Sequence, residues 1–503
     1  MKNQPLFSKY LYPGGLVISL FVVYLLTLAP GLTWANGGSD GGDLITATAT
    51  GGIAHPTGYP LYLLAAKLFQ SIPVGSLAFR TNLMSAIFAV SASLLVYGLV
   101  VHYSSSRVIG LVSAFSFGLS PLMWSQAVIT EVYAIHAFFV ALILYLSSDH
   151  ASLKFIQKNL DHGIGLIFGL ALGNHLTTVL LFPILLYPLF SRQSISLNEN
   201  SPGRMWLFDR QAFLKQLTGI GVGLSVYLTL PLRAVFQPPI NWGNPRTLDG
   251  FVWLVSGKLY QDQLLVLTLE SILTRTRAVA ALLIDQFGIP GLLIGLIGLV
   301  VYYKPSPLFR NTIWTFFAFS AFAIAYATHD SYIYLIPAFL CFAVWIGLGL
   351  NGLAELASKN FRYTSALFGV VFLIYIFILA GTHWGQVDAS KDLRAEEFGN
   401  EVLIQAPANA ILFVRGDKAI FTMWYFHFAL HDRQDLLIVV TDLLGFDWYQ
   451  DSLISTYPAL KLSGPIPSVD VIAVENPSRP TCQIEYIQSM LIDCLSAWDL
   501  QEP

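Results

Sequence analysis

Long apolar runs recur along the chain from the N-terminus to about residue 383, separated by short polar stretches. Most runs are about 16 to 24 residues long, and about 20 apolar residues suffice for a helix to cross a bilayer. The pattern predicts eleven transmembrane helices, at approximately 14–32, 83–103, 107–124, 132–148, 163–174, 176–191, 216–232, 279–302, 311–328, 332–352 and 363–383. The fifth and sixth of these could form one long helix, but Gly173, Asn174 and His175 fit a turn better than a position in lipid.

The first apolar run needs separate treatment, because Lys2 and Lys9 precede it as they would in a signal peptide. Counted over 12–32 it reaches about 21 residues, which is enough to span a bilayer. No small-x-small cleavage site follows it. We therefore expect an uncleaved first transmembrane helix.

Lysine and arginine orient the eleven helices, since positive loops face the cytoplasm. The opposite side carries the 33–60 stretch, which has neither residue, the long 233–277 loop and the C-terminal region. We expect a plasma-membrane protein with a cytoplasmic N-terminus and an extracytoplasmic C-terminal domain. The cytoplasmic residues are Lys2, Lys9, Arg107, Lys154, Lys158, Arg192, Arg204, Arg210, Lys215, Lys304, Arg310, Lys359 and Arg362.

The C-terminal region has a different pattern, in which short buried strands alternate with helical segments. The segments are 410–414, 436–440 and 469–474 for strands and 392–406 and 422–430 for helices. The predicted fold is thus an α-helical polytopic membrane domain over 1–384, followed by a small α/β extracytoplasmic domain over 385–503.

Composition supports membrane residence and narrows the function. Charged residues make up 11% of the chain and hydrophobic residues 55%, against roughly 25% charged in a soluble domain. The net charge of −3 argues against a nucleic-acid binder. Cys341 lies in an apolar span, whereas Cys482 and Cys494 flank a predicted helix and are either a disulfide or two free thiols.

Candidate catalytic residues gather on the predicted outer side. Asp40 and Asp43 are three residues apart, so they could act as a base and its partner or bind a divalent cation together. The same spacing would suit a capping box, with Asp40 as N-cap and Asp43 at N3. Both interpretations stay open, and no cofactor is certain.

Further polar residues on this side predict a substrate-binding surface. His55 and Tyr59 precede prolines in a stiff loop, and Glu131 stands where a helix begins. His136 lies one turn further into that helix, and an intramembrane ionisable residue is a functional candidate. The candidate substrate-binding residues are His55, Tyr59, Glu131, Tyr133, His136, Asn174, His175, Arg233, Asn241, Trp242 and Lys258.

The cations of the 233–277 loop would suit a lipid phosphate, because arginine grips phosphate bidentately. No nucleotide-binding loop, zinc-ligand spacing or nucleophile elbow is present. Hydrolysis of ATP by this chain is therefore not expected.

Several outer-loop motifs follow one another in a specific order. Asp40-Gly-Gly-Asp43 is followed by HPTGYPLY at 55–62 and by Asn82. Further segments are PLMWSQ at 121–126, TEVY at 130–133, GNH at 173–175 and NWG at 241–243. Together they resemble glycosyltransferase family 117, a GT-C group related to protein O-mannosyltransferases. The family pattern is closer to Asp-Ser-Gly-Glu, so Asp43 replaces a longer acid.

The resemblance implies an enzyme that moves a sugar from a polyprenyl-phosphate-linked donor to a protein, lipid or glycan acceptor, with inversion. Asp40 or Asp43 would be the general base, and Arg233, helped by His55 or Lys258, would stabilise the departing phosphate. Two other functions remain open: a transporter or flippase for lipid-linked sugars, and a non-catalytic membrane scaffold.

Overall fold

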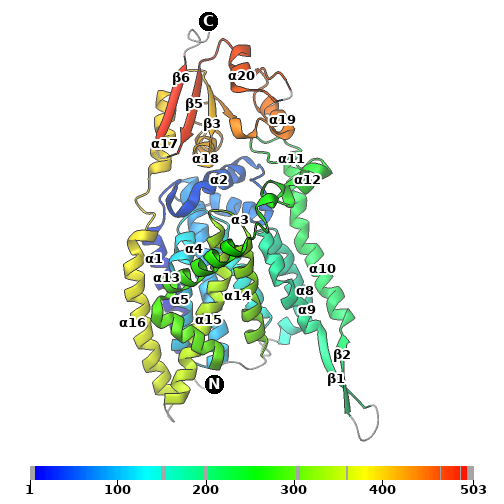
Figure 1. Cartoon of the computed structure of the whole chain (residues 1–503), viewed down its shortest axis with the longest axis vertical. Coiled ribbons are helices and arrows are strands. Elements are labelled where there is room, and N and C mark those ends of the chain that lie inside the picture. The colour runs from blue at the N-terminus through cyan, green and yellow to red at the C-terminus, as the bar shows by residue number, and fades with distance from the viewer. Residues whose placement is uncertain are drawn as a thin grey trace.

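A computed structural model describes residues 6–148, 154–196, 202–301, 306–357, 361–464, 466–487 and 489–495. A helical bundle forms one end of the molecule, and a small sheet domain forms the other (Figure 1). Short helices lie between these two parts, and they carry most of the predicted site residues.

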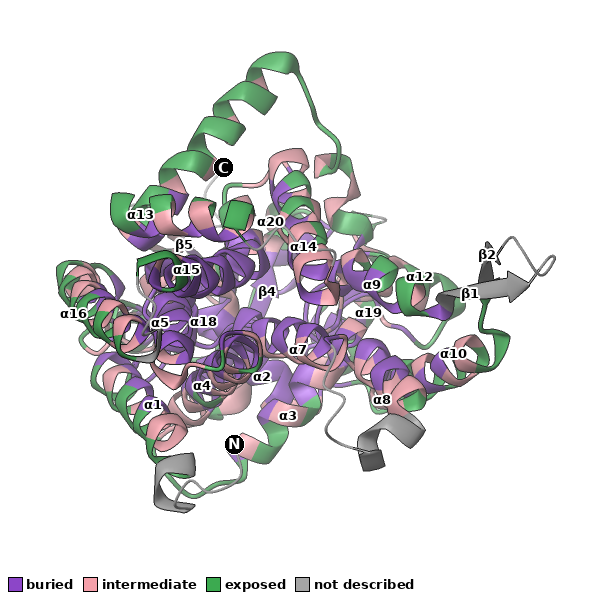
Figure 2. Cartoon of the chain, turned by 90° about the horizontal axis from the view of Figure 1, so that it is seen from below, coloured by how far each residue is buried: buried purple, intermediate pink, exposed green. Residues whose placement is uncertain are grey.

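Seven helical segments in the described residues are long and apolar enough to cross a membrane. They are α1 (Leu6–Thr27), α4 (Leu77–Ser104), α10 with α11 (Arg210–Ala234), α13 (Leu269–Val301), α14 (Pro307–Ala325), η6 with α15 (Ser331–Ala357) and α16 (Phe361–Val387). Nearly all of the η6–α15 segment is buried, so it forms the centre of the bundle (Figure 2).

Shorter or bent helices occupy the other predicted positions. The chain bends by 69° between α5 (Arg107–Gly118) and α6 (Pro121–Ala127). If this bent pair is counted as one span, the described residues contain up to eight spans. Three apolar helices of fewer residues follow, in α7 (Tyr133–Leu146), in α8 (Lys154–Leu172) and over Leu176–Leu189, which contains α9 (Phe182–Leu186). Each lies at a predicted helix, but the total of eleven spans stays a prediction.

The turn predicted at residues 173–175 is present, because α8 ends at Leu172 and a new helical segment starts at Leu176. Asn174 holds this turn against the start of α7 by donating from Nδ2 to the Val132 carbonyl (3.2 Å). A hairpin of β1 (Phe190–Ser196) and β2 (Pro202–Phe208), which was not predicted, extends from the opposite end of the bundle (Figure 1).

The C-terminal domain is built on a four-stranded sheet of order β4-β3-β5-β6. Its strands are β3 (Ile411–Arg415), β4 (Leu437–Val440), β5 (Thr481–Tyr486) and β6 (Met490–Leu495). β3 runs parallel to both β4 and β5, and β5 pairs antiparallel with β6. The first two predicted strands are confirmed, and helices α17 (Arg394–Gln405), α18 (Asp417–Trp424) and α19 (Asp447–Thr456) surround the sheet.

The third predicted strand is wrong, since residues 469–474 lie in helix α20 (Val469–Glu475). Ile472, Ala473 and Asn476 are buried there, and this spacing follows a helical period rather than the alternation of a strand. The Ser468 side chain accepts a hydrogen bond from the Val471 amide and caps the helix. A capping residue therefore decides between the two structures.

The helix expected between Cys482 and Cys494 is also wrong, because these residues stand opposite each other on β5 and β6. They form a disulfide, with their Cα atoms 4.0 Å apart. The predicted domain division at 384/385 falls inside α16, which continues to Val387, and the division itself stays a prediction.

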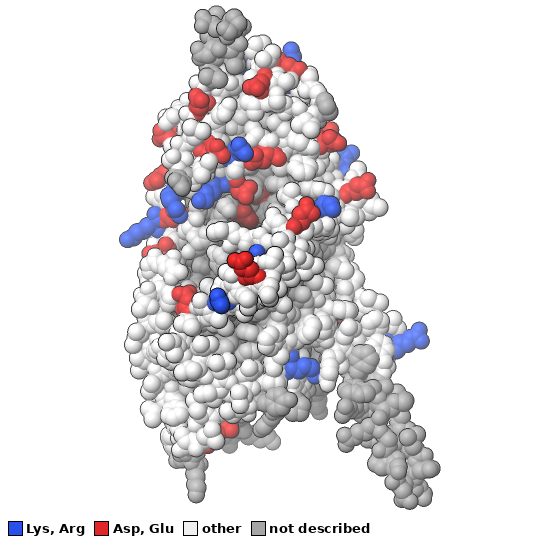
Figure 3. Space-filling model, in the orientation of Figure 1, with Lys and Arg blue, Asp and Glu red and all other residues white. Residues whose placement is uncertain are grey.

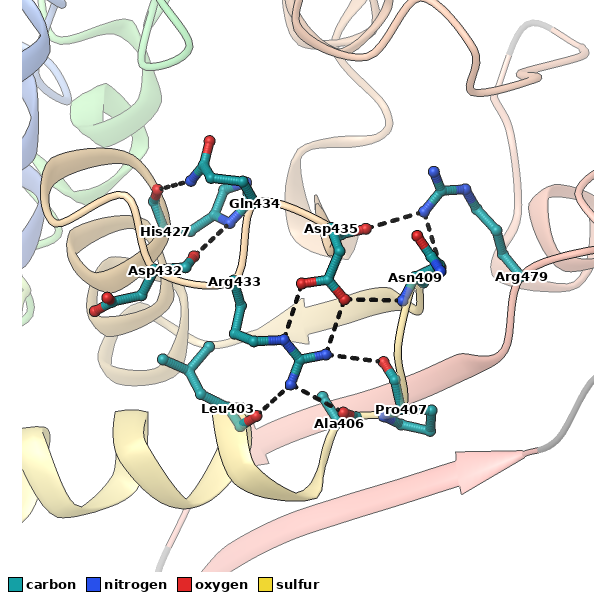
Figure 4. A network of polar contacts seen from close by, with 10 residues as sticks. All are labelled: Leu403, Ala406, Pro407, Asn409, His427, Asp432, Arg433, Gln434, Asp435 and Arg479. Carbon is teal, nitrogen blue, oxygen red and sulfur yellow. Dashed lines mark hydrogen bonds and ion pairs between the residues drawn. The ribbon is translucent and has the colours of Figure 1, made fainter.

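A half-buried arginine in the loop before β4 connects that loop to the end of α17 (Figure 4). Arg433 donates from Nη1 to the carbonyls of Leu403 and Ala406, and from Nη2 to that of Pro407. Its Nε and Nη2 also bind Asp435 at 2.9 Å each. One side chain thus satisfies the carbonyls left free where α17 ends.

Candidate active site

A cavity of about 860 Å³ lies between the helical bundle and the C-terminal domain. Figure 3 shows a hollow at this level in which acidic residues are visible. The elements around it include η1 (Ala35–Asp40), the loop that precedes α3 (Pro60–Gln70), η5 (Lys258–Gln263) and α18. Segments far apart in the sequence therefore meet at one site.

Asp43 is enclosed at the base of this site, in the first turn of α2 (Gly41–Thr50). Its side chain is 0% exposed. Oδ2 accepts hydrogen bonds from the His55 amide (2.9 Å) and contacts His55 Nδ1 at 2.7 Å, and Oδ1 accepts from Trp242 Nε1 (3.1 Å). Both oxygens are thus occupied, so Asp43 holds His55 and Trp242 in place.

Asp40 immediately precedes α2 and has a different environment. Its carboxylate makes no capping bond to the helix, so the capping-box interpretation is wrong. Its side chain is 39% exposed and lines the cavity. Its Oδ2 lies 3.6 Å from His55 Nε2. Burial raises the pKa of Asp40 and the His55 charge partly opposes that rise.

His55 is placed between the two carboxylates. Burial alone would lower the pKa of His55, but Asp40 and the hydrogen-bonded Asp43 together raise it to about 9. The imidazole is therefore positively charged at neutral pH. The Phe421 ring stacks on the imidazole with a centroid distance of 6.2 Å, and the Tyr59 ring makes an edge contact with it at a centroid distance of 5.1 Å. These two rings fix the orientation of the imidazole.

Helix α18 of the C-terminal domain packs tightly onto α2. A Cβ atom at Gly42 would lie 2.4 Å from the Phe421 carbonyl oxygen, so only glycine allows this approach. The contact brings Phe421 over His55, and both Phe421 and Asp417 line the cavity. The C-terminal domain is therefore part of the site.

The structure brings most of the predicted residues together but leaves some outside. Behind the cavity wall, His136 packs against His175 with ring centroids 4.8 Å apart. Asn241 donates from Nδ2 to Asn244 Oδ1 (3.4 Å) and is absent from the lining. The predicted residues that line the cavity are Asp40, His55, Tyr59, Glu131, Tyr133, His175 and Trp242.

The two cations predicted to bind phosphate point elsewhere. Arg233 donates from Nη1 to the Gly52 carbonyl (3.1 Å), and Lys258 Nζ lies 3.4 Å from Gln261 Oε1. Within the described residues, the cavity lining includes neither lysine nor arginine. Of the three predicted cations, His55 is the one that faces the cavity.

Several residues that line the cavity were not predicted from the sequence. Asp417 lies two residues after β3, and polar residues at the carboxyl end of a parallel strand are a known signal for a site. The turn before α15 also contributes polar residues to the lining, among them His329 and Asp330. The missed residues include Tyr260, Tyr326, His329, Asp330, Tyr332, Tyr334, Asp417 and Phe421.

A metal site was the open alternative for Asp40 and Asp43. Across the residues that the structure describes, no group of three or more histidine, cysteine or acidic residues is arranged to hold a metal ion. The Asp43 oxygens are taken by N–H donors. Charged His55 already lies between the carboxylates, where a cation would sit.

Two family models match parts of this chain. The Protein O-mannosyl-transferase TMEM260 N-terminal domain matches residues 40–198, and TMEM260-associated domain 2 matches residues 395–469. The first match starts at Asp40 and includes His55 and Glu131, and the second includes Asp417. Both matched segments therefore contribute residues to the cavity.

Curated relatives agree with these models over most of the chain. Protein O-mannosyl-transferase TMEM260 of Mus musculus is 25% identical over 489 residues, which cover 89% of this chain and 65% of that protein. The Dictyostelium discoideum protein tmem260, with the same description, is 24% identical over 509 residues and is covered to 59%. This chain thus spans about three fifths of the length of these relatives.

Solved structures show the architecture. ArnT from Cupriavidus metallidurans bound to undecaprenyl phosphate superposes with a TM-score of 0.55 at 13% identity, over 96% of this chain and 93% of that one. Its apo form gives 0.56 at 11% identity, over 95% and 93%. The chain has a GT-C fold. The predicted resemblance to GT-C glycosyltransferases is confirmed, as is a multi-pass membrane protein with a small C-terminal sheet domain.

Proposed function

We propose that this GT-C chain is a membrane glycosyltransferase that moves a sugar from a polyprenyl-phosphate-linked donor to an extracytoplasmic acceptor hydroxyl. The observation that carries the proposal is the arrangement of Asp40, His55 and Asp43 at a large cavity beside the bundle. The curated relatives are named protein O-mannosyl-transferases, so mannose is the sugar to test first.

Asp40 is the proposed general base, because its carboxylate is accessible from the cavity while that of Asp43 is fully enclosed. The acceptor oxygen attacks the anomeric carbon as the bond from that carbon to the phosphate oxygen breaks. The acceptor proton passes to Asp40, and the bonding electrons leave with the polyprenyl phosphate. Attack opposite the leaving group inverts the anomeric centre.

His55 is the proposed electrostatic partner of the departing phosphate, since it is the predicted cation that lines the cavity. Asp43 fixes its Nδ1 side and leaves Nε2 toward Asp40. Arg233 would have to release the Gly52 carbonyl to assist. Asp43 is therefore a positioning residue in this scheme.

The apolar part of the cavity wall is suited to a polyprenyl chain. It lies where the segment after α8 meets α14 and the loop before α13, all beside the bundle. ArnT, whose crystal structure contains undecaprenyl phosphate, has the same fold. The apolar lining residues are Leu176, Val179, Leu180, Leu264, Phe322 and Ile333.

Reconstituted enzyme tests the proposal directly. Purified wild type, Asp40→Asn and the control Asp451→Asn, an exposed acid on α19, are incubated with short-chain polyprenyl-phosphate mannose and hydroxyl acceptors. We expect release of polyprenyl phosphate by wild type and Asp451→Asn, and a loss of about 10²- to 10⁴-fold in Asp40→Asn. Full turnover in folded Asp40→Asn would show that Asp40 is not the general base. Saturable binding of the donor by wild type without any turnover would favour a transporter or scaffold.

A further inference from the structure

Glu131 is a cavity residue that the proposed chemistry does not use. It lies between α6 and α7, is 6% exposed and lines the cavity. Within the described part of the chain, the Glu131 carboxyl accepts one hydrogen bond, from the backbone amide of the next residue, Val132. A buried carboxyl with spare hydrogen-bonding capacity facing an open cavity indicates a ligand contact.

The fold holds Glu131 beside Asp40. Thr130, the residue before Glu131, packs against Gly41, the residue after Asp40: a Cβ atom at Gly41 would lie 3.4 Å from the Thr130 Cβ atom. Thr130 donates from Oγ1 to Asn82 Oδ1 (2.6 Å), and Asn82 donates from Nδ2 to the Ala29 carbonyl (3.0 Å). The loop that carries Glu131 is therefore anchored to the chain segment that leads to the proposed base.

The surroundings of Glu131 favour its protonated form. Burial first, and then the Asp40 charge, raise the pKa of Glu131 well above its ordinary value, while charged His55 opposes them. Asp330 adds a smaller effect in the same direction as Asp40. A neutral carboxyl both donates and accepts a hydrogen bond, as a sugar hydroxyl does.

We propose that Glu131 selects the donor sugar, by donating one hydrogen bond to a pyranose hydroxyl and accepting another. The proposal rests on the proposed function. Glu131 comes from the bundle side of the cavity, where the lipid-linked donor lies, whereas Asp417 comes from the C-terminal domain. The neighbouring rings of Tyr133 and Tyr334, 5.9 Å apart, offer an apolar surface for the sugar.

The test compares Glu131→Gln, which mimics the neutral acid, with Glu131→Ala. Each is measured for KM, kcat and equilibrium binding with short-chain polyprenyl-phosphate mannose and its monodeoxy analogues. We expect KM to rise about 10- to 100-fold in Glu131→Ala and to stay within about threefold in Glu131→Gln. One deoxy analogue should weaken wild type by the same factor and cost Glu131→Ala nothing further.

Two results would overturn the assignment. If Glu131→Gln is as damaging as Glu131→Ala, the ionised form is the working one. If wild type and Glu131→Ala discriminate equally among the deoxy analogues, Glu131 has only a structural role. Failure of the proposed function looks different, because wild type would then turn over no donor. The binding series alone would then decide, and equal affinities in wild type and Glu131→Ala would exclude a sugar contact.

Discussion

Asp40 and Asp43 are chemically alike but differ in what surrounds each carboxylate. Asp43 receives N–H groups from His55 and Trp242 and is fully buried. The carboxylate of Asp40 is partly exposed, and Ser39 donates to it at 3.3 Å. Spacing alone could not separate the two residues, because the difference arises from a tryptophan that lies 199 positions along the chain from Asp43.

Replacement of each acid should therefore have a different cost in stability. An asparagine at position 43 presents an NH₂ group where a donor already points, so at least one N–H of His55 or Trp242 loses its partner. We expect Asp43→Asn to lower the free energy of unfolding by about 1–3 kcal/mol and Asp40→Asn to change it less, because Asp40 contributes a charge interaction with His55 but no buried hydrogen bond. Thermal unfolding in detergent measures both, and an equal loss in the two variants would contradict this assignment.

The charges of the site also set a pH dependence. Burial raises the pKa of Asp40, and Asp40 together with Asp43 raises that of His55 to about 9 against the opposing effect of burial. Turnover should rise with pH as Asp40 ionises and fall as His55 loses its proton near pH 9. Because the folded pKa of His55 exceeds the ordinary 6.5, its contribution to stability is complete below about pH 6.5 and is lost as pH rises through about 9.

The pH–rate profile of wild type and His55→Gln checks this prediction. The alkaline fall should be present in wild type and absent from the residual turnover of His55→Gln. A fall at the same pH in both proteins would assign it to another group.

At the scale of elements, the contact between α2 and α18 joins the C-terminal domain to the proposed catalytic residues. Gly42→Ala would place a Cβ atom 2.4 Å from a backbone oxygen, which cannot move aside as a side chain does. We expect this variant to displace Phe421 from His55, to lose about tenfold or more in kcat/KM and to unfold at lower temperature.

Gly445→Ala is the matched control, because nothing lies within 4 Å of its Cβ position. Steady-state kinetics of the two alanine variants separate local crowding from a general effect of replacing glycine. Wild-type kinetics in Gly42→Ala would show that α18 does not need this close approach.

The sequence predicted elements better where long periodic patterns decide than where a single side chain does. The bundle helices were recognised from apolar length, which the bilayer dictates. The segment 469–474 was assigned the wrong structure because six residues are too few to show a period, and Ser468 capping settles it as a helix. The position of Asp417 after β3 is a local signal for a site, but its place in the cavity also depends on the packing of α18 onto α2, which the local pattern does not contain.

At the scale of the whole molecule, the positive charges predict on which side the cavity opens. Ile333, before α15, lines the cavity, so the other end of α15 near Leu356 must lie toward the opposite face. The lysine and arginine distribution assigns that face to the cytoplasm. The disulfide between Cys482 and Cys494 agrees with an oxidising compartment for the C-terminal domain.

Single-cysteine labelling tests this orientation. In a protein without the disulfide pair, Gly445→Cys and Leu356→Cys place one thiol at each end, at an uncrowded and a 78% exposed position, while native Cys341 is buried. In right-side-out vesicles, a membrane-impermeant maleimide should label Gly445→Cys at once and Leu356→Cys only after permeabilisation. The reverse pattern would place the cavity on the cytoplasmic side, where a soluble nucleotide sugar could reach it. Labelling of both thiols before permeabilisation would mean that an even number of spans separates the two positions.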